Sequence, residues 1–258
     1  MSRTALVTGA ASGIGKATAE VLSARGYEVI GADLRGADIN VDLTTEEGRK
    51  ALAEDGTRLS GGTLDAVVAV AGLALPTATT VAVNYFGMVS TLVDLRPLLA
   101  ASSAPRAAGV ASMASLFPVD DQLTAAMTAS DEAAAMARGL ELEDTEGAQL
   151  IYSSTKKAFS QWVRRNAATA QWAGAGIPLN AVAPGIIATP MTADLIATEE
   201  ARSELLGMVP MPLNGIAEPV VVANLLAWLV SEENSHLCGQ VVFVDGGSDV
   251  VIRGDSTW

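Results

Sequence analysis

The sequence predicts a single α/β domain with a doubly wound parallel sheet over residues 1–258. Short apolar runs rich in valine and isoleucine alternate with longer helix-like segments, which is typical of a parallel sheet covered by helices on both faces. The run LDAVVAVAG shows no polar alternation, as expected of a strand buried on both sides. No internal repeat or low-complexity linker divides the chain, and its length is within the range of one α/β unit.

The first half of the chain supplies three expected strands and two helices, in alternation. A short apolar strand is expected at 4–7, followed by a helix at 13–24 that begins directly after a glycine-rich turn. The second strand is expected at 28–32 and a short helix at 46–53. The third strand, 64–70, is the continuous apolar run and ends where Ala71 and Gly72 follow it.

The second half continues the alternation around two irregular segments. We expect a long helix at 81–101, a strand at 107–111 and a second long helix at 152–174, which Gly174 and Gly176 break. A strand at 179–183 stops before Pro184 and Gly185. The remaining expected elements are a helix at 219–229 and a last strand at 240–244.

Two segments do not follow this alternation. Residues 117–150 are alanine-rich and contain eight acidic residues but only one basic residue, Arg138. Within them, Ser130, Asp131 and Glu132 predict a helix N-terminus, with a hydroxyl cap and carboxylates near the positive end of the helix dipole. Residues 189–216 carry three methionines and several leucines, interrupted by prolines.

Charge and composition exclude several classes of protein. Half of the residues are hydrophobic and 17% are charged, which is incompatible with a disordered chain. The net charge of −13 argues against nucleic acid and anionic membranes as partners. No apolar stretch is long enough for membrane insertion, and the N-terminus is unlike a signal peptide, so we expect a cytoplasmic protein. The single cysteine, Cys238, cannot form an intrachain disulfide; neither it nor His236 has a metal-ligand companion, so no metal is expected.

A glycine-rich motif, TGAASGIG from Thr8 to Gly15, lies between the first strand and the first helix. Glycines there permit a tight turn and close approach to a pyrophosphate, and the helix N-terminus behind them offers free N–H groups. Asp33 ends the second strand, where a carboxylate can accept hydrogen bonds from an adenosine ribose and repel a 2′-phosphate. NAD is therefore favoured over NADP. Arg35, two residues after Asp33, weakens this preference slightly. The alternative is a glycine loop in an α/β fold that binds no nucleotide.

A tyrosine and a lysine four residues apart, Tyr152 and Lys156, lie on one face of the long helix at 152–174. A lysine ammonium beside a phenol, together with a cationic nicotinamide, favours the phenolate, which can exchange a proton with an alcohol or carbonyl. Neither Tyr27 nor Tyr85 has such a partner, because the residues four positions on are glycine and valine. The alternative is a chance helical pair.

Two further polar residues lie near these motifs. Ser112 follows the expected strand at 107–111, at the sheet edge where open α/β sheets bind ligands, and could hold a substrate oxygen beside Tyr152. Taken alone, Ser112 is better interpreted as an ordinary turn serine at the end of a strand. Asn84 lies in an apolar helical stretch, where a buried amide needs a partner. Its alternative is a solvent-facing position on the helix.

Together these motifs resemble those of the short-chain dehydrogenase/reductase family over nearly the whole chain, including YSSTK, PGIIAT at 184–189 and VDGG at 244–247. The resemblance implies a Rossmann-type fold and a catalytic tetrad of Asn84, Ser112, Tyr152 and Lys156. In that family the tyrosine is the acid/base, the serine positions the carbonyl, the lysine lowers the phenol pKa and holds the nicotinamide ribose, and the asparagine anchors a water that relays protons. The implied cofactor contacts are Gly9, Ser12, Gly13, Ile14, Gly15, Asp33, Leu34, Asp42, Leu43, Ala71, Gly72, Tyr152, Lys156, Pro184, Gly185, Ile187 and Thr189.

Three departures from the family pattern narrow the resemblance. Ser112 and Tyr152 are unusually far apart, which identifies 117–150 as a helical insertion. The link from Gly72 to Asn84 is short, and the usual Asn-Ala-Gly reads Val-Ala-Gly. These features resemble the bacterial branch of 3α-hydroxysteroid dehydrogenases/carbonyl reductases. In that branch the insertion covers a surface that other members use for tetramer packing, so a homodimer is favoured over a tetramer.

The resemblance also identifies residues 189–216 as a substrate lid. The alternative is plain core packing of an amphipathic helix, which would account for the leucines. The methionines of the lid adapt to irregular apolar shapes, which favours a hydrophobic small-molecule substrate such as a 3-hydroxysteroid or its ketone. An aryl ketone or aryl amino alcohol is the alternative, because Asp120 and Asp121 could attract an amine. A third hypothesis, of another class, is an NAD-sensing protein without turnover; the intact tyrosine, lysine, serine and asparagine argue against it.

Overall fold

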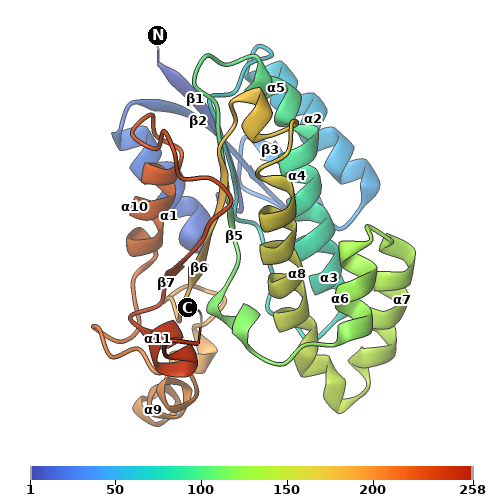
Figure 1. The fold of residues 1–258 in the computed structure, drawn as a ribbon, viewed down its shortest axis with the longest axis vertical. Coiled ribbons are helices and arrows are strands. Elements are labelled where there is room, and N and C mark those ends of the chain that lie inside the picture. Colours follow the sequence, from blue (N-terminus) through green and yellow to red (C-terminus); the bar gives the residue numbers. More distant parts are fainter. Residues whose placement is uncertain (1, 257–258) are drawn as a thin grey trace.

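The central feature of the computed structural model, which describes residues 2–256, is one seven-stranded sheet in which each neighbouring pair of strands is parallel (Figure 1). The strand order is β3-β2-β1-β4-β5-β6-β7, so the winding direction reverses at β1 and β4. The strands are β1 Arg3–Thr8, β2 Tyr27–Asp33, β3 Ile39–Asn40, β4 Ala66–Ala69, β5 Arg106–Val110, β6 Leu179–Pro184 and β7 Val241–Val244. The expected doubly wound fold class is confirmed; residues 1 and 257–258 of the expected domain lie outside the described residues.

Helices cover both faces of this sheet. Helices α1 and α10 lie on one face, and α2, α4, α5 and α8 lie on the other (Figure 1). The α-helices are α1 Gly13–Ala24, α2 Glu46–Leu59, α3 Ala78–Val81, α4 Met88–Asp94, α5 Arg96–Ala100, α6 Asp121–Thr128, α7 Glu132–Glu143, α8 Leu150–Asn166, α9 Glu199–Met208, α10 Pro219–Leu229 and α11 Ser248–Arg253. A π-helical segment, η1 Ala82–Gly87, joins α3 to α4, and the 3₁₀ turns are η2 Met113–Leu116, η3 Glu146–Gln149, η4 Ala173–Ala175 and η5 Asp194–Ile196.

The two apolar layers follow from the alternation of side chains along each strand. Ala5 and Val7 of β1 face α1 and α10, where they join a cluster with Leu226. Leu6, between them, faces the opposite layer beneath α2, α4 and α8. On that side β5 has no side chain at Gly109, and a Cβ there would lie 2.5 Å from the ring of Phe159 of α8. The helix therefore packs very close to the centre of the sheet.

Several helix boundaries differ from the sequence expectation. The helix expected at 81–101 is divided by the π-helical segment and again before Pro97, which lacks the N–H that a continuous helix needs. The helix expected at 152–174 ends at Asn166, whose side-chain amide donates to the Trp162 carbonyl. Helix α2 continues beyond the expected 46–53 because Gly56 allows it to pack closely against Leu95. The elements β3, α9 and α11 were not expected.

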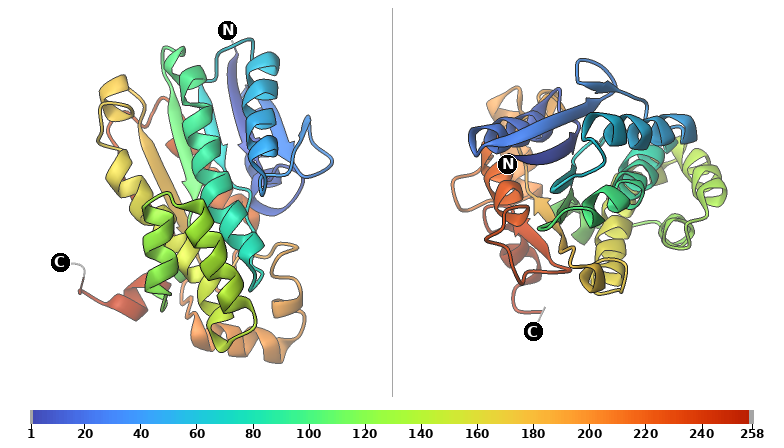
Figure 2. Two further views of the ribbon diagram at one scale, coloured as in Figure 1. Left: turned by 90° about the vertical axis from the view of Figure 1, so that its right-hand side faces the viewer. Right: turned by 90° about the horizontal axis from the view of Figure 1, so that it is seen from above.

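The acidic segment 117–150 forms a helical pair, α6 and α7, on the outside of the layer that contains α3 and α8 (Figure 2). A helix does begin at Glu132, as expected, but its cap is the Asp131 carboxylate, which accepts from the Ala134 N–H at 3.0 Å. The expected hydroxyl cap is wrong, because Ser130 has a left-handed backbone with φ of 58° and precedes the cap.

Among residues 2–256, no helix combines the length and the apolar character needed to cross a bilayer.

Candidate active site

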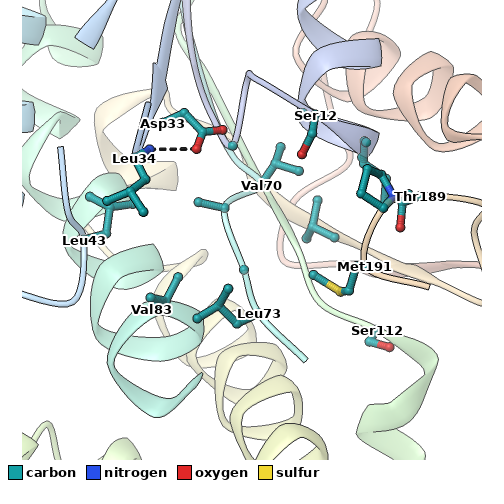
Figure 3. Close-up of a pocket in the computed structure, with 18 of the residues that line it drawn as sticks. Ser12, Asp33, Leu34, Leu43, Val70, Leu73, Val83, Ser112, Thr189 and Met191 are labelled. Atoms are coloured by element: carbon teal, nitrogen blue, oxygen red, sulfur yellow. Dashed lines mark hydrogen bonds between the residues drawn. The ribbon is translucent and has the colours of Figure 1, made fainter. Parts of the chain in front are cut away.

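A cavity of about 570 Å³ lies at the carboxyl ends of the strands, where the sheet reverses its winding at β1 and β4. This is the edge at which open α/β sheets bind ligands. Its walls come from the turns after β1 to β6 and from residues of α3, η1 and α8, and apolar and polar side chains converge on it (Figure 3). All but one of the sequence-predicted site residues line the cavity; the exception is Asn84, which lies behind Gly72.

The glycine-rich turn forms the cavity wall at the start of α1. Gly9 and Gly13 have φ of +70° and +51°, a left-handed backbone that favours glycine. A Cβ on Gly15 would overlap the Gly9 carbonyl oxygen, so only glycine permits this tight turn. Ser12 precedes α1, and its hydroxyl makes no capping bond within the described residues. This cradle, with free N–H groups and no side chains in the way, fits a pyrophosphate.

The carboxylate of Asp33 lies at the end of β2 and faces the cavity (Figure 3). Its Oδ1 accepts from the Leu34 N–H at 2.7 Å and its Oδ2 from the Ala11 N–H at 3.0 Å. These bonds fix the carboxylate in one orientation while both oxygens keep acceptor capacity. Asp33 is thus placed to accept hydrogen bonds from a ribose, as the sequence predicts.

The next part of the wall fits a flat, largely apolar group. Leu34, Leu43 and Val83 line this part of the cavity (Figure 3). Asp42 turns the chain here, because its Oδ1 accepts from the Thr44 N–H at 2.9 Å and from the Thr44 hydroxyl at 2.7 Å. The adenine position expected beside Asp42 and Leu43 is therefore bounded by packed side chains and a rigid turn.

The turns after β4 and β6 form the two sides of the remaining cavity. The Thr8 hydroxyl accepts from the Val70 and Ala71 N–H groups at 3.0 and 3.2 Å, which ties the ends of β1 and β4 together. Opposite them lie Pro184, Gly185, Ile187 and Thr189. The Thr192 hydroxyl donates to the Ile187 carbonyl and accepts from the Thr189 N–H, so it shapes this second side.

Tyr152, Lys156 and Ser112 converge at the far end of the cavity. Tyr152 and Lys156 lie on successive turns of α8, and the Lys156 Nζ lies 5.7 Å from the centre of the Tyr152 ring. The Nζ donates to the Val110 carbonyl at 2.9 Å, which anchors it to the end of β5. Ser112 caps η2 by accepting from the Ala114 N–H at 3.1 Å, and its hydroxyl is near enough to the Tyr152 phenol to affect the pKa of that phenol.

Burial shifts the pKa values of Tyr152 and Lys156 in the directions that favour the neutral form of each group. The pKa of Tyr152 is raised by desolvation, and the hydrogen bond to Ser112 opposes this by lowering it. Desolvation lowers the pKa of Lys156 to about 8. Without a further positive charge in the cavity, the phenol is therefore protonated at neutral pH, which is the form that a proton donor needs.

Asn84 lies in the π-helical segment η1, and its side chain is fully buried. Its Oδ1 accepts from the Leu73 N–H at 2.7 Å and its Nδ2 donates to the Leu73 carbonyl at 2.8 Å. The Nδ2 also lies 3.3 Å from the Thr155 hydroxyl of α8. The side chain therefore ties the chain after β4 to the helix that carries Tyr152 and Lys156. The solvent-facing alternative for Asn84 is wrong.

A small apolar cluster adjoins the end of the cavity beyond Ser112. Its buried members are Met113, Ile186, Val209 and Met211, and residues of the segment 189–216 pack against them. Met191 of the same segment lines the cavity itself and points into it (Figure 3). An apolar molecule that reached Ser112 and Tyr152 would therefore meet apolar side chains.

Some functional side chains were not predicted from the sequence. Leu73 and Val83 line the cavity, but as apolar residues they resemble any core residue in sequence. Met191 was expected only as part of the substrate lid. Thr8 belongs to the glycine motif, yet only the structure shows what its hydroxyl bonds. The strand-end position of Thr8 was the one available signal.

Comparisons with known proteins agree with this fold. A family model described as enoyl-(acyl carrier protein) reductase matches residues 9–249. The 3-alpha-hydroxysteroid dehydrogenase/carbonyl reductase of Comamonas testosteroni is 36% identical, over 96% of this chain and 97% of that protein. The cis-4-hydroxycyclohexanecarboxylate dehydrogenase of Sinomonas cyclohexanicum is 32% identical, over 96% and 97%. The crystal structure of the 3-alpha-hydroxysteroid dehydrogenase from Pseudomonas sp. B-0831 complexed with NADH superposes with a TM-score of 0.88 at 36% identity, over 98% and 99%.

The fold and the site define a dinucleotide-dependent oxidoreductase. The chain belongs to the short-chain dehydrogenase/reductase family, as its motifs predicted, and the expected enzyme class is confirmed. The roles of individual site residues stay predictions.

Proposed function

We propose that this protein is an NAD(H)-dependent dehydrogenase/reductase that interconverts a bulky hydrophobic secondary alcohol and its ketone, with 3-hydroxysteroids and 3-ketosteroids as the substrate class. One observation carries the proposal: the phenol of Tyr152 and the hydroxyl of Ser112 meet at the end of a dinucleotide-sized cavity, directly beside the apolar cluster around Met113 and Met211. Two relatives that are 36% identical are named for 3-alpha-hydroxysteroid oxidation, which supports this substrate class.

The residues of the chain perform the proton chemistry. In the reductive direction Ser112 donates a hydrogen bond to the substrate carbonyl oxygen and holds it against the phenol. Tyr152 then gives its proton to that oxygen, and in the oxidative direction it takes the proton back from the alcohol. Bound NAD(H) supplies the complementary hydride exchange at the carbonyl carbon. The ammonium of Lys156, fixed on the Val110 carbonyl, stabilises the phenolate left after proton transfer.

After it has given its proton to the substrate, the Tyr152 phenolate regains a proton by a relay through the small space beside Gly72. A Cβ at Gly72 would lie 3.1 Å from Asn84 Oδ1 and 3.6 Å from Lys156 Nζ, so both polar atoms border one small volume that glycine leaves open. A water there can bridge Asn84 and Lys156, which is the relay that the family resemblance implies. Asn84 Oδ1 accepts one bond from Leu73 and retains a second lone pair for it.

NAD is assigned as the cofactor because the Asp33 carboxylate lies where a ribose 2′-hydroxyl would donate to it. The side chain is held there by two backbone N–H groups. A 2′-phosphate in the same place would be repelled. The NADH complex of the relative from Pseudomonas sp. supports this choice.

Of the two carboxylates that the amino-alcohol alternative invokes, Asp120 is already engaged within the insertion. Arg138 forms an ion pair with Asp120 at 2.7 Å, which lowers the pKa of that carboxyl and neutralises its charge. Asp120 also caps α6 by accepting from the Leu123 N–H at 2.7 Å. It is therefore committed to the insertion itself and has little attraction left for a substrate amine.

Steady-state assays of NADH absorbance test the function. An androstane 3-ketone is expected to be reduced with a higher kcat/KM than an aryl ketone or an aryl amino ketone. Tyr152→Phe is expected to lower kcat by about 10²–10⁴-fold with NADH still bound. Tyr27→Phe is the matched control, since that hydroxyl bonds the Val230 carbonyl away from the cavity.

Preference for the aryl substrates would replace the steroid assignment, and retained turnover of Tyr152→Phe would refute the proton role. NADH binding without reduction of any carbonyl would identify a sensing protein instead. The homodimer and the cytoplasmic location also stay proposals, and sedimentation velocity tests the first.

A further inference from the structure

The insertion helix α7 is fixed at both ends to the body of the protein. At its start, Glu132 forms a bidentate ion pair with Arg49 of α2, with N–O distances of 2.8 to 3.0 Å. Arg49 is buried, so this contact has a defined geometry and not that of a loose surface pair. At its other end, Glu143 reaches the first residue of α3 and accepts a hydrogen bond from the Ala78 N–H.

Glu143 supplies the cap that helix α3 lacks locally. Thr77 precedes α3 but makes no capping bond, and its buried hydroxyl has no partner among the described residues. The Glu143 carboxylate accepts from one of the free N–H groups of the first turn and places a negative charge at the positive end of the helix dipole. The cap of α3 therefore comes from a residue 65 positions away in the chain.

The two helices are also in direct contact at Gly139. A Cβ at Gly139 would lie 3.1 Å from the Ala78 Cβ and 3.3 Å from Val81 Cγ2. The backbone of α7 thus packs against α3, so a shift of one helix is transmitted to the other. Figure 2 shows α7 lying across this side of the molecule.

Helix α3 leads without interruption into the π-helical segment that holds Asn84. Three side chains hold the chain between Gly72 and α3. The amide of Asn84 bonds Leu73, the Thr80 hydroxyl donates to the Leu75 carbonyl at 2.7 Å, and Glu143 accepts from the Ala78 N–H. Leu73 and Thr79, at either end of this stretch, line the cavity. The position of the wall beside Tyr152 and Lys156 therefore depends on these contacts, of which only the one from Glu143 comes from the insertion.

We propose that Glu143 is a positioning residue of the active site, which acts through α3 on the placement of Asn84 and of the Leu73 backbone. The insertion then adds a third support to the wall formed by the short link from Gly72 to Asn84, which Asn84 and Thr80 also hold. The kinetic consequence rests on the proposed function, whereas the structural consequence does not.

The test compares Glu143→Ala, which removes the acceptor, with Glu143→Gln, which keeps an acceptor oxygen but loses the charge. Glu146→Gln is the matched control, because it removes the same charge from an exposed position three residues on. Amide hydrogen exchange by mass spectrometry is measured on the full-length protein without cofactor. For Glu143→Ala we expect protection of peptides that cover residues 73–84 to fall about fivefold, the effect of one helix cap. For Glu143→Gln we expect about twofold, and no change for the control.

Kinetics provide the second readout. Glu143→Ala is expected to lower kcat about fivefold and to leave the NADH dissociation constant within twofold of the wild-type value. Glu143→Gln is expected to regain most of the lost kcat. Unchanged exchange over 73–84, or a loss of protection spread evenly over the chain, overturns the proposal, and so does lower thermal stability with unchanged kcat. If Glu143→Ala does not fold, the exchange of Glu143→Gln decides. If the wild-type protein reduces no carbonyl, the proposed function fails while the exchange result still stands.

Discussion

Replacement of Lys156 by methionine offers a quantitative test of how strongly the fold desolvates the active site. Lys156 is 4% exposed, and the Val110 carbonyl is its hydrogen-bond acceptor. Burial lowers its pKa from 10.5 to about 8. Because one pKa unit corresponds to about 1.4 kcal/mol, charging Lys156 in the folded state opposes folding by about 3 kcal/mol. Methionine fills a similar apolar volume without a charge.

The pH dependence of this effect has a definite sign. Below pH 8 the lysine is protonated in the folded and the unfolded chain, so the wild type bears the full unfavourable free energy. As the pH rises from 8 toward 10.5, the folded chain loses the proton first and the wild type becomes more stable relative to Lys156→Met. The difference in unfolding free energy should therefore shift in favour of the wild type by about 2–3 kcal/mol between about pH 7 and pH 10.

Urea unfolding of the cofactor-free protein, followed by circular dichroism at several pH values over this range, measures the difference. Packing changes caused by methionine add a constant, so only the slope with pH matters. Lys157→Met, one residue along the same helix, controls for the loss of a lysine. A difference between Lys156→Met and wild type that stays constant with pH would show that water hydrates the ammonium in the folded state, and the argument from burial would be refuted.

The remaining predictions concern close contacts and cofactor choice. Gly15→Ala should weaken NADH binding at least about tenfold in a fluorescence titration, because its Cβ would overlap the Gly9 carbonyl; Gly207→Ala, which meets no atom within 4 Å in the described chain, should not. Gly109→Ala should lower the unfolding free energy by about 1–3 kcal/mol in urea, through its overlap with Phe159. Asp33→Ala should raise the ratio of kcat/KM with NADPH to that with NADH by at least about tenfold, and an unchanged ratio would contradict the role of the carboxylate.

The strands that position the site could be predicted from sequence because each is a short, mostly apolar block ended by glycine, proline or a polar residue. This holds for all strands but β3, which has only two residues and is too short for any pattern. The π-helical turn at Asn84 could not be predicted, since one helical turn with a different hydrogen-bond spacing leaves the apolar pattern of its flanks unchanged. The helix around Asn84 was therefore expected to be continuous.

The candidate site was predictable where chemistry is concentrated in a motif, and less so where it depends on contacts across the chain. Tyr152 and Lys156 are one helical turn apart, so their juxtaposition follows from local geometry alone. The partner of Asn84 is a backbone group, at Leu73, which no residue type can signal. The ion pair between Arg49 and Glu132 joins residues 83 positions apart, so the docking of the insertion was equally hidden.

The contact between Gly109 and Phe159 also has a consequence for the orientation of α8. Phe159 lies three residues after Lys156, and its ring occupies the place where any other residue at 109 would have a Cβ. A helix held in this way can neither slide along β5 nor rotate about its axis without driving the ring into the backbone. The register that brings Tyr152 to Ser112, and Lys156 to the Val110 carbonyl, is thus determined by an aromatic ring and a missing methyl group in the interior, one to two helical turns from the chemistry.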